Sequence, residues 1–153
     1  MPEETQIFSQ GQIQTFSAAL NRIIPAQGDM PGAGDLGLAR FVEGAASASP
    51  SNTRLFTQGL STIELTNSRL TGKEFTQATG QEQDQALQNV ESSNGAFFDE
   101  LVRQTYNGYY TTPDVFRAMG YSIPQPDING QPELLDESLL ENQRQRAPFW
   151  TKA

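Results

Sequence analysis

The sequence contains neither cysteine nor histidine among its 153 residues. Their absence excludes disulfides, thiol nucleophiles, structural zinc centres, thiolate-bound iron–sulfur clusters, covalently attached haem and Ser-His-Asp triads. The redox compartment is left open by the same absence. We predict no catalytic, cofactor-binding or metal-binding residue in this chain.

Basic residues and long apolar runs are also scarce. Lys73 and Lys152 are the only lysines, and the formal net charge is -8. Binding to nucleic acid or to an anionic membrane surface needs clustered positive charge, so neither is expected. No apolar run approaches the roughly 20 residues of a membrane-spanning helix, and no direct membrane span is predicted.

Apolar residues recur along the sequence at spacings of three and four, which is the pattern of helices buried on one side. We predict an all-α fold, a small bundle of five or six helices in residues 1–120, followed by an extended C-terminal tail in residues 121–153. The predicted helices cover residues 9–24, 35–46, 53–70, 79–92, 97–107 and 112–119.

Local signals mark where several of these helices begin and end. Ser9 is a predicted N-cap, and Pro25 ends the first helix because proline cannot continue the hydrogen-bond ladder. Thr79 and Glu82 form a predicted capping box. The helix that they open should lie on the surface, because its apolar face consists only of Ala86, Leu87 and Val90.

The helix that begins at Phe97 is the one around which the others are predicted to pack. Gly108 is expected to end it in the left-handed conformation, which glycine adopts without a steric penalty. Tyr109 and Tyr110 would then leave the helix as extended chain.

The loop between the first two helices contains a Gly-x-Gly-x-x-Gly pattern at Gly32, Gly34 and Gly37. This is the spacing of dinucleotide-binding turns, but such a turn follows a β-strand inside a βαβ unit. Here the preceding element is a helix that ends in Ile-Ile-Pro. A flexible loop and helix start is therefore the favoured interpretation.

Two further sets of side chains are candidate sites. Tyr106, Tyr109 and Tyr110 could line a ligand site, but half-buried tyrosines where a helix leaves the core are the favoured interpretation. Asp99 and Glu100 are sequence neighbours on a helix and diverge, so they do not form a pair suited to acid–base catalysis.

The tail loses helical periodicity but keeps its apolar residues. Prolines interrupt its first half, and only residues 134–146 are compatible with one more short helix. The tail is too apolar for a solvated linker and too irregular for a core of its own, so we expect it to lie along a partner. The alternative is that it folds back onto its own helices. The predicted partner-binding residues are Tyr109, Tyr110, Ile123, Ile128, Leu139, Leu140, Phe149 and Trp150.

Several segments, in this order, resemble the gluconate 2-dehydrogenase subunit 3 family over about residues 10–121. The most specific is the helix at Phe97 followed by Gly-Tyr-Tyr-Thr-x-Pro. The full set is Leu20-Asn-Arg-Ile-Ile-Pro25, Pro31-Gly-Ala33 with Asp35, Phe41-Val42, Gly59-Leu60 to Leu70, Phe75, Phe97-Phe98-Asp-Glu-Leu101-Val-Arg-Gln-Thr105 and Gly108-Tyr-Tyr-Thr-Thr-Pro113.

The resemblance implies a non-catalytic small subunit that binds, stabilises and is a candidate chaperone for a sugar or polyol dehydrogenase. Its expected partner is a large flavoprotein of the glucose-methanol-choline type, which holds FAD. A multi-haem cytochrome c subunit often accepts the electrons in such complexes. No cofactor is expected in this chain itself.

Members of the family commonly carry a twin-arginine leader, and Arg-Arg does not occur in this sequence. A chain that is complete as given is expected in the cytoplasm. The resemblance implies the periplasm if a leader is missing or is supplied by a partner.

Two alternatives to the accessory subunit stay open. One is a free-standing helical enzyme or small-ligand binder that uses the tyrosines near Tyr109. The other is an interaction module with an unrelated partner.

Overall fold

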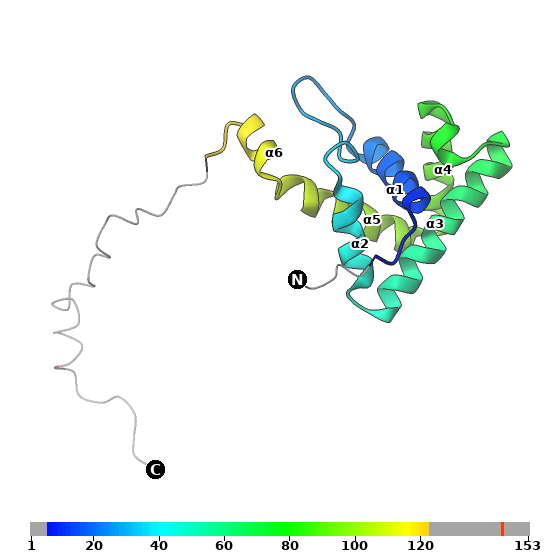
Figure 1. Cartoon of the computed structure of the whole chain (residues 1–153), viewed down its shortest axis with the longest axis horizontal. Helices are drawn as coiled ribbons and strands as arrows, with labels where there is room; N and C mark the ends of the chain where they lie inside the picture. The colour runs from blue at the N-terminus through cyan, green and yellow to red at the C-terminus, as the bar shows by residue number, and fades with distance from the viewer. Residues whose placement is uncertain (1–5, 123–144, 146–153) are drawn as a thin grey trace, which may run out of the picture. The chain divides into compact units, whose positions relative to one another are not determined.

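The computed structural model describes residues 6–122 and residue 145. Within these residues the chain forms six α-helices, one short 3₁₀ helix and no strand (Figure 1). The predicted all-α bundle of five or six helices is confirmed. The elements are α1 (Gln10–Ile23), α2 (Leu38–Ser47), α3 (Pro50–Thr71), η1 (Phe75–Gln77), α4 (Gly80–Ser93), α5 (Gly95–Tyr110) and α6 (Pro113–Ala118).

The chain divides into two units, Met1–Ser122 and Ile123–Ala153. All the described helices belong to the first of these units. Apart from residue 145, the tail beyond residue 122 lies outside the described residues, and so does the short helix predicted at 134–146.

The predicted helix starts at Ser9 and Thr79 are confirmed. The Ser9 hydroxyl accepts a hydrogen bond from the Gln12 amide, and the Gln12 side chain accepts one from the Ser9 amide. Thr79 and Glu82 form the same reciprocal pair at the start of α4. These capping boxes satisfy amides that have no partner inside the helix.

Helices α2 and α3 begin at other residues than predicted. The predicted start of α2 at Asp35 is wrong, because Gly37 adopts a left-handed conformation and the helix begins only after it, at Leu38. Helix α3 begins three residues before the predicted Thr53. Ser49 caps it through the Asn52 amide, and Pro50 occupies the first turn, where its missing N–H is not needed.

The predicted end of α5 at Gly108 is also wrong. The helix continues through Tyr110, and Gly108 is a buried residue inside it with no positive φ. A Cβ at Gly108 would lie 2.9 Å from Cδ1 of Phe41 on α2. Gly108 therefore allows α5 and α2 to pack closely. Tyr109 and Tyr110 both lie in the last turn of α5.

A row of phenylalanine rings runs through the centre of the bundle. Phe8 contacts Phe16 with ring centroids 5.1 Å apart, Phe16 lies 6.2 Å from Phe56, and Phe56 lies 5.8 Å from Phe97. The last three rings are fully buried. The row joins the N-terminal segment, α1, α3 and α5 into one core.

Several large apolar and aromatic side chains of the helices lie on the surface. Phe41, Tyr106 and Leu70 are each between 44% and 48% exposed. By contrast, the sparse apolar face predicted for α4 is buried at Ala86, Leu87 and Val90. Packing in the core therefore does not account for the exposed aromatic rings on α2 and α5.

Candidate functional site

The glycine-rich loop between α1 and α2 is attached to α1 by hydrogen bonds. The Asn21 side-chain oxygen accepts from the Gly34 amide at 2.8 Å and from the Asp35 amide at 3.3 Å, and the Asn21 amide group donates to Asp35 at 3.0 Å. A Cβ at Gly34 would lie 2.0 Å from the Ser17 carbonyl oxygen. The glycine is needed because the loop packs directly on the helix backbone. The Gly34 and Asp35 amides are engaged with the Asn21 side chain and are not presented to a phosphate.

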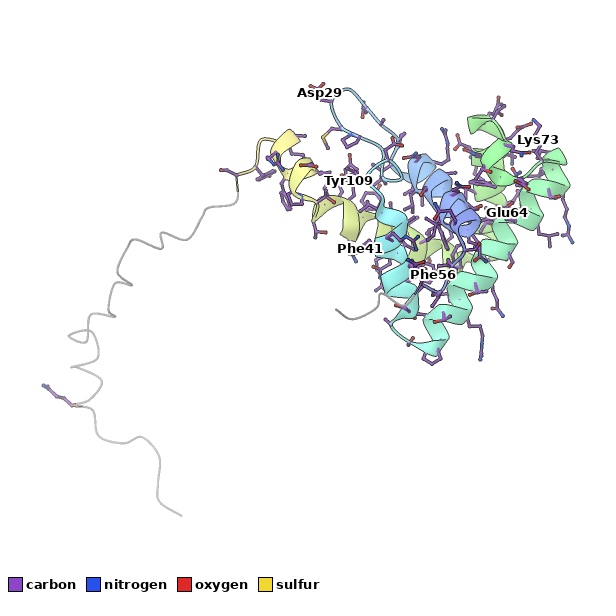
Figure 2. All side chains as sticks on the ribbon, in the orientation of Figure 1. Asp29, Phe41, Phe56, Glu64, Lys73 and Tyr109 are labelled. Atoms are coloured by element: carbon purple, nitrogen blue, oxygen red, sulfur yellow. The ribbon has the colours of Figure 1, made fainter. Side chains whose placement is uncertain are left out.

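Tyr109 connects the same loop to α5. Its ring is 2% exposed, and its hydroxyl donates a 2.8 Å hydrogen bond to the Pro31 carbonyl oxygen. Burial raises the pKa of the Tyr109 phenol, and neighbouring Tyr110 raises it further. Figure 2 shows Tyr109 near the base of the loop that carries Asp29 at its tip. This predicted partner-binding residue is thus placed in the interior, with almost no surface for a ligand or a partner.

Tyr106 and Tyr110, one helical turn apart, form an exposed pair on α5. Each is 44% exposed, and their rings stack with centroids 5.9 Å apart and an angle of 17° between the ring planes. Tyr110 also makes an edge-to-face contact with Tyr109, with centroids 5.3 Å apart. The buried ring therefore holds the exposed pair in place.

The buried carboxylate Glu43 anchors the N-terminal segment to α2. One of its oxygens accepts from the Ile7 and Phe8 amides at 2.9 Å, and the other pairs with Arg40 at 2.6 Å. Burial acts to raise the pKa of Glu43, but these two amides and the guanidinium together lower it. The carboxylate is a structural anion with all its contacts inside the domain.

Two other carboxylates join helices in a similar way. Glu64 on α3 accepts from the Thr15 hydroxyl of α1 at 2.6 Å and from the Phe75 amide of η1 at 3.2 Å. Asp84 on α4 receives two hydrogen bonds of 2.7 Å from the Arg22 guanidinium of α1, which lowers the pKa of Asp84. Both carboxylates therefore accept hydrogen bonds that connect separate helices.

Residues 6–122 contain neither a metal-binding cluster nor a membrane-spanning helix. No cluster of three or more aspartate and glutamate side chains in this part could hold a metal ion. None of its helices is both long enough and apolar enough to cross a bilayer.

Surface grooves offer the remaining candidate sites. One of about 760 Å³ lies beside the start of α3 and is lined largely by hydroxyl side chains with Ile7 and Arg54. Another of about 550 Å³ runs along α3 past Leu65 to Glu74. A third, of about 310 Å³, lies between α4 and α5 and includes Tyr106.

The groove between α4 and α5 is the best candidate among the three, because it contains one ring of the exposed tyrosine pair. Its apolar and aromatic lining consists of Ile23, Leu87, Phe98, Val102 and Tyr106. We call these five residues together with Tyr110 the tyrosine groove. The sequence carried a signal for it, because Phe98, Val102 and Tyr106 recur every fourth residue on one face of a helix.

The structure thus places the predicted partner-binding residues differently. Tyr110 is exposed beside a groove, whereas Tyr109 is buried. The other predicted residues lie outside the described part of the chain. They are Ile123, Ile128, Leu139, Leu140, Phe149 and Trp150.

Comparison with known protein families identifies a match. The family model described as gluconate 2-dehydrogenase subunit 3 matches residues 10–123. No curated protein and no solved structure matches the chain. The matched range includes all six helices and both the glycine-rich loop and the tyrosine groove.

Proposed function

The chain belongs to the gluconate 2-dehydrogenase subunit 3 family, and we propose that it is a non-catalytic accessory subunit that binds and stabilises an FAD-dependent dehydrogenase subunit. The family match carries the proposal, since it spans every described helix. The proposed partner is a large flavoprotein of the glucose-methanol-choline type that oxidises a sugar or polyol. We also propose that this chain acts as a chaperone toward that subunit. A multi-haem cytochrome c subunit, which accepts the electrons, is the proposed third component of the complex.

The use of the carboxylates supports a binding role over a catalytic one. Glu43, Glu64 and Asp84 are each occupied by donors that hold helices or segments together. A general base must be free to accept a proton from a substrate within hydrogen-bonding distance. These three groups instead stabilise the domain.

The burial of Tyr109 weakens the alternative of a small-ligand binder that uses this residue. Its hydroxyl is bonded to the Pro31 carbonyl, and a ligand could reach it only after the loop had moved away. Tyr110 is accessible, but it lies on an open surface beside a shallow groove. Such a surface is better suited to a protein partner than to an enclosed small molecule.

We also propose that residues 123–153 lie along the flavoprotein. Phe149 and Trp150 are adjacent, and aromatic side chains are the commonest anchors of protein interfaces. Ile123, Ile128, Leu139 and Leu140 would add apolar contact area. An apolar segment of this kind is more than an isolated soluble monomer usually exposes.

Co-purification tests the proposed function. The full chain, carrying an affinity tag, is expressed together with a candidate flavoprotein, and the eluate is analysed by gel filtration and flavin absorbance. We expect a yellow complex in which a larger chain elutes together with the tagged one. If the tagged chain elutes alone, the proposal is wrong, and sugar oxidation by the isolated chain would favour the free-standing enzyme.

A further inference from the structure

The tyrosine groove has an apolar floor supplied by three helices. Ile23 comes from the end of α1, Leu87 from α4, and Phe98 and Val102 from α5. Leu87 is buried, while Ile23 and Phe98 are partly buried and pack against the core. The floor is therefore formed by side chains that the fold already fixes, and it needs little ordering when a partner binds.

The exposed tyrosine pair of the groove is fixed as well. Tyr106 stacks on Tyr110, which packs edge-to-face on Tyr109, and the Tyr109 hydroxyl is bonded to the Pro31 carbonyl. This chain of contacts reduces the conformational freedom that the exposed rings would lose on binding. Rigid aromatic surfaces of this kind favour tight contact at a low entropic cost.

The charge at the groove is negative. Arg22 and Asp84 both line it, but they neutralise each other through two hydrogen bonds of 2.7 Å. Glu91 also lines it, is exposed, and forms no ion pair with any residue in 6–122. An unpaired carboxylate near an exposed tyrosine ring favours a cationic side chain, and a guanidinium can both stack on the ring and pair with the carboxylate.

From these observations we infer that the tyrosine groove docks an apolar and basic segment of the large dehydrogenase subunit. An aliphatic side chain of that segment lies on the floor formed by Leu87, Phe98 and Val102. An arginine or lysine of the same segment lies over Tyr106 and pairs with Glu91. The inference rests on the proposed function, because it identifies the part of the accessory subunit that contacts the partner and the chemistry of the segment it binds.

The test measures the affinity of the full chain for the flavoprotein by calorimetry, with variants of the groove. Tyr106→Ala and Glu91→Arg should each weaken binding by about tenfold or more, as expected for interface anchors that contribute more than 1 kcal/mol. The loss in Glu91→Arg should shrink at high salt, since it is electrostatic.

Two matched controls lie outside the groove. Asp29→Arg makes the same charge change at the tip of the glycine-rich loop (Figure 2). Leu65→Ala removes a side chain that is 53% exposed on α3 and lines a different groove. Both should bind the flavoprotein within about threefold of the unchanged protein, and circular dichroism should show that all four variants keep their helices.

The outcomes separate the possibilities. If the unchanged chain binds but the groove variants bind equally well, the inference is overturned while the proposed function stands. An equal loss in Asp29→Arg overturns the specific role of Glu91, because net charge alone would then explain it. Loss of self-association in Tyr106→Ala, with flavoprotein binding unchanged, assigns the groove to a second copy of this chain and overturns the inference. Failure of the unchanged chain to bind overturns the proposed function itself.

Discussion

Gly59 sets how closely α3 approaches α5. A Cβ at this position would lie 2.1 Å from Cδ2 of the buried Phe97 ring, and that ring is itself held edge-to-face against Phe56. We expect Gly59→Ala to lower the free energy of unfolding by about 1–3 kcal/mol, because a methyl group forces the packed ring to shift. Urea unfolding followed by circular dichroism measures the change.

Gly44 provides the matched control for this substitution. It is also a helical glycine, in α2, but a Cβ there would meet no neighbour within 4 Å. Gly44→Ala should raise the free energy of unfolding by roughly 0.5–1 kcal/mol, since alanine is the better helix former. Equal effects of the two substitutions would show that the contact with Phe97 is not what matters at Gly59.

The contacts of Glu43 make part of the stability depend on pH. Because the folded protein lowers the pKa of this carboxyl, the ionised form stabilises the native state. That contribution is fully present above the ordinary glutamate pKa of about 4.3, and it is lost as the pH falls through the lower folded value. Glu43→Gln should therefore be less stable than the unchanged protein near neutral pH, and the difference should shrink on acidification below about pH 4. A difference that does not change with pH would rule out this role for the charge.

Among the helices, α4 depends on a cap that the sequence reveals directly. The Thr79 hydroxyl accepts from the Glu82 amide, and the Glu82 carboxylate accepts from the Thr79 amide at 2.7 Å. We expect Thr79→Ala to reduce the free energy of unfolding by about 1 kcal/mol. Thr79→Ser should keep most of the stability that the cap contributes, because serine supplies the same hydroxyl acceptor. If thermal or urea unfolding gives the same stability for both variants, the cap does not hold this wall of the tyrosine groove in place.

Helix boundaries were predictable where the signal is local and ambiguous where it depends on a neighbour. Ser9 and Thr79 bond to residues three positions away, so their sequences suffice. Gly108 is different, because a glycine after an apolar stripe suits both a left-handed end and a close contact. The close approach of Phe41 and Leu38 from α2 decides between them, and no local pattern encodes it.

The same ambiguity affected the candidate site. Ending α5 at Gly108 placed Tyr109 and Tyr110 together in extended chain, whereas the continued helix turns Tyr109 inward and brings Tyr110 beside Tyr106. The apolar stripe of α5 could be read from the sequence, but the α1 and α4 walls of the groove could not. The positions of α1 and α4 beside α5 depend on tertiary packing, which includes the bidentate contact of Arg22 with Asp84.

For the whole molecule, the division at Ser122 separates folding from the proposed second contact with the partner. The described core lies entirely before that residue, so a chain that ends at Ser122 should keep its helices and unfold cooperatively. It should bind the flavoprotein at least about tenfold more weakly than the full chain, because Phe149, Trp150 and the other apolar anchors are gone.

Circular dichroism and calorimetry on that shortened chain measure both properties. Loss of helical structure would show that the helical domain needs residues 123–153 in order to fold. Unchanged affinity would show that these residues do not anchor the partner, and would leave the tyrosine groove as the remaining proposed contact.

The most direct measurement is the amount of soluble, flavin-loaded dehydrogenase subunit obtained with and without this chain. The flavoprotein is expressed alone or together with the full chain, and flavin absorbance per polypeptide is recorded together with turnover per bound flavin. An accessory subunit that binds and stabilises its partner should raise the yield of flavin-loaded protein in a stable complex, while turnover per flavin stays within a few-fold. Equal yields with no complex, or turnover that requires a side chain of the small subunit, would contradict the proposed role.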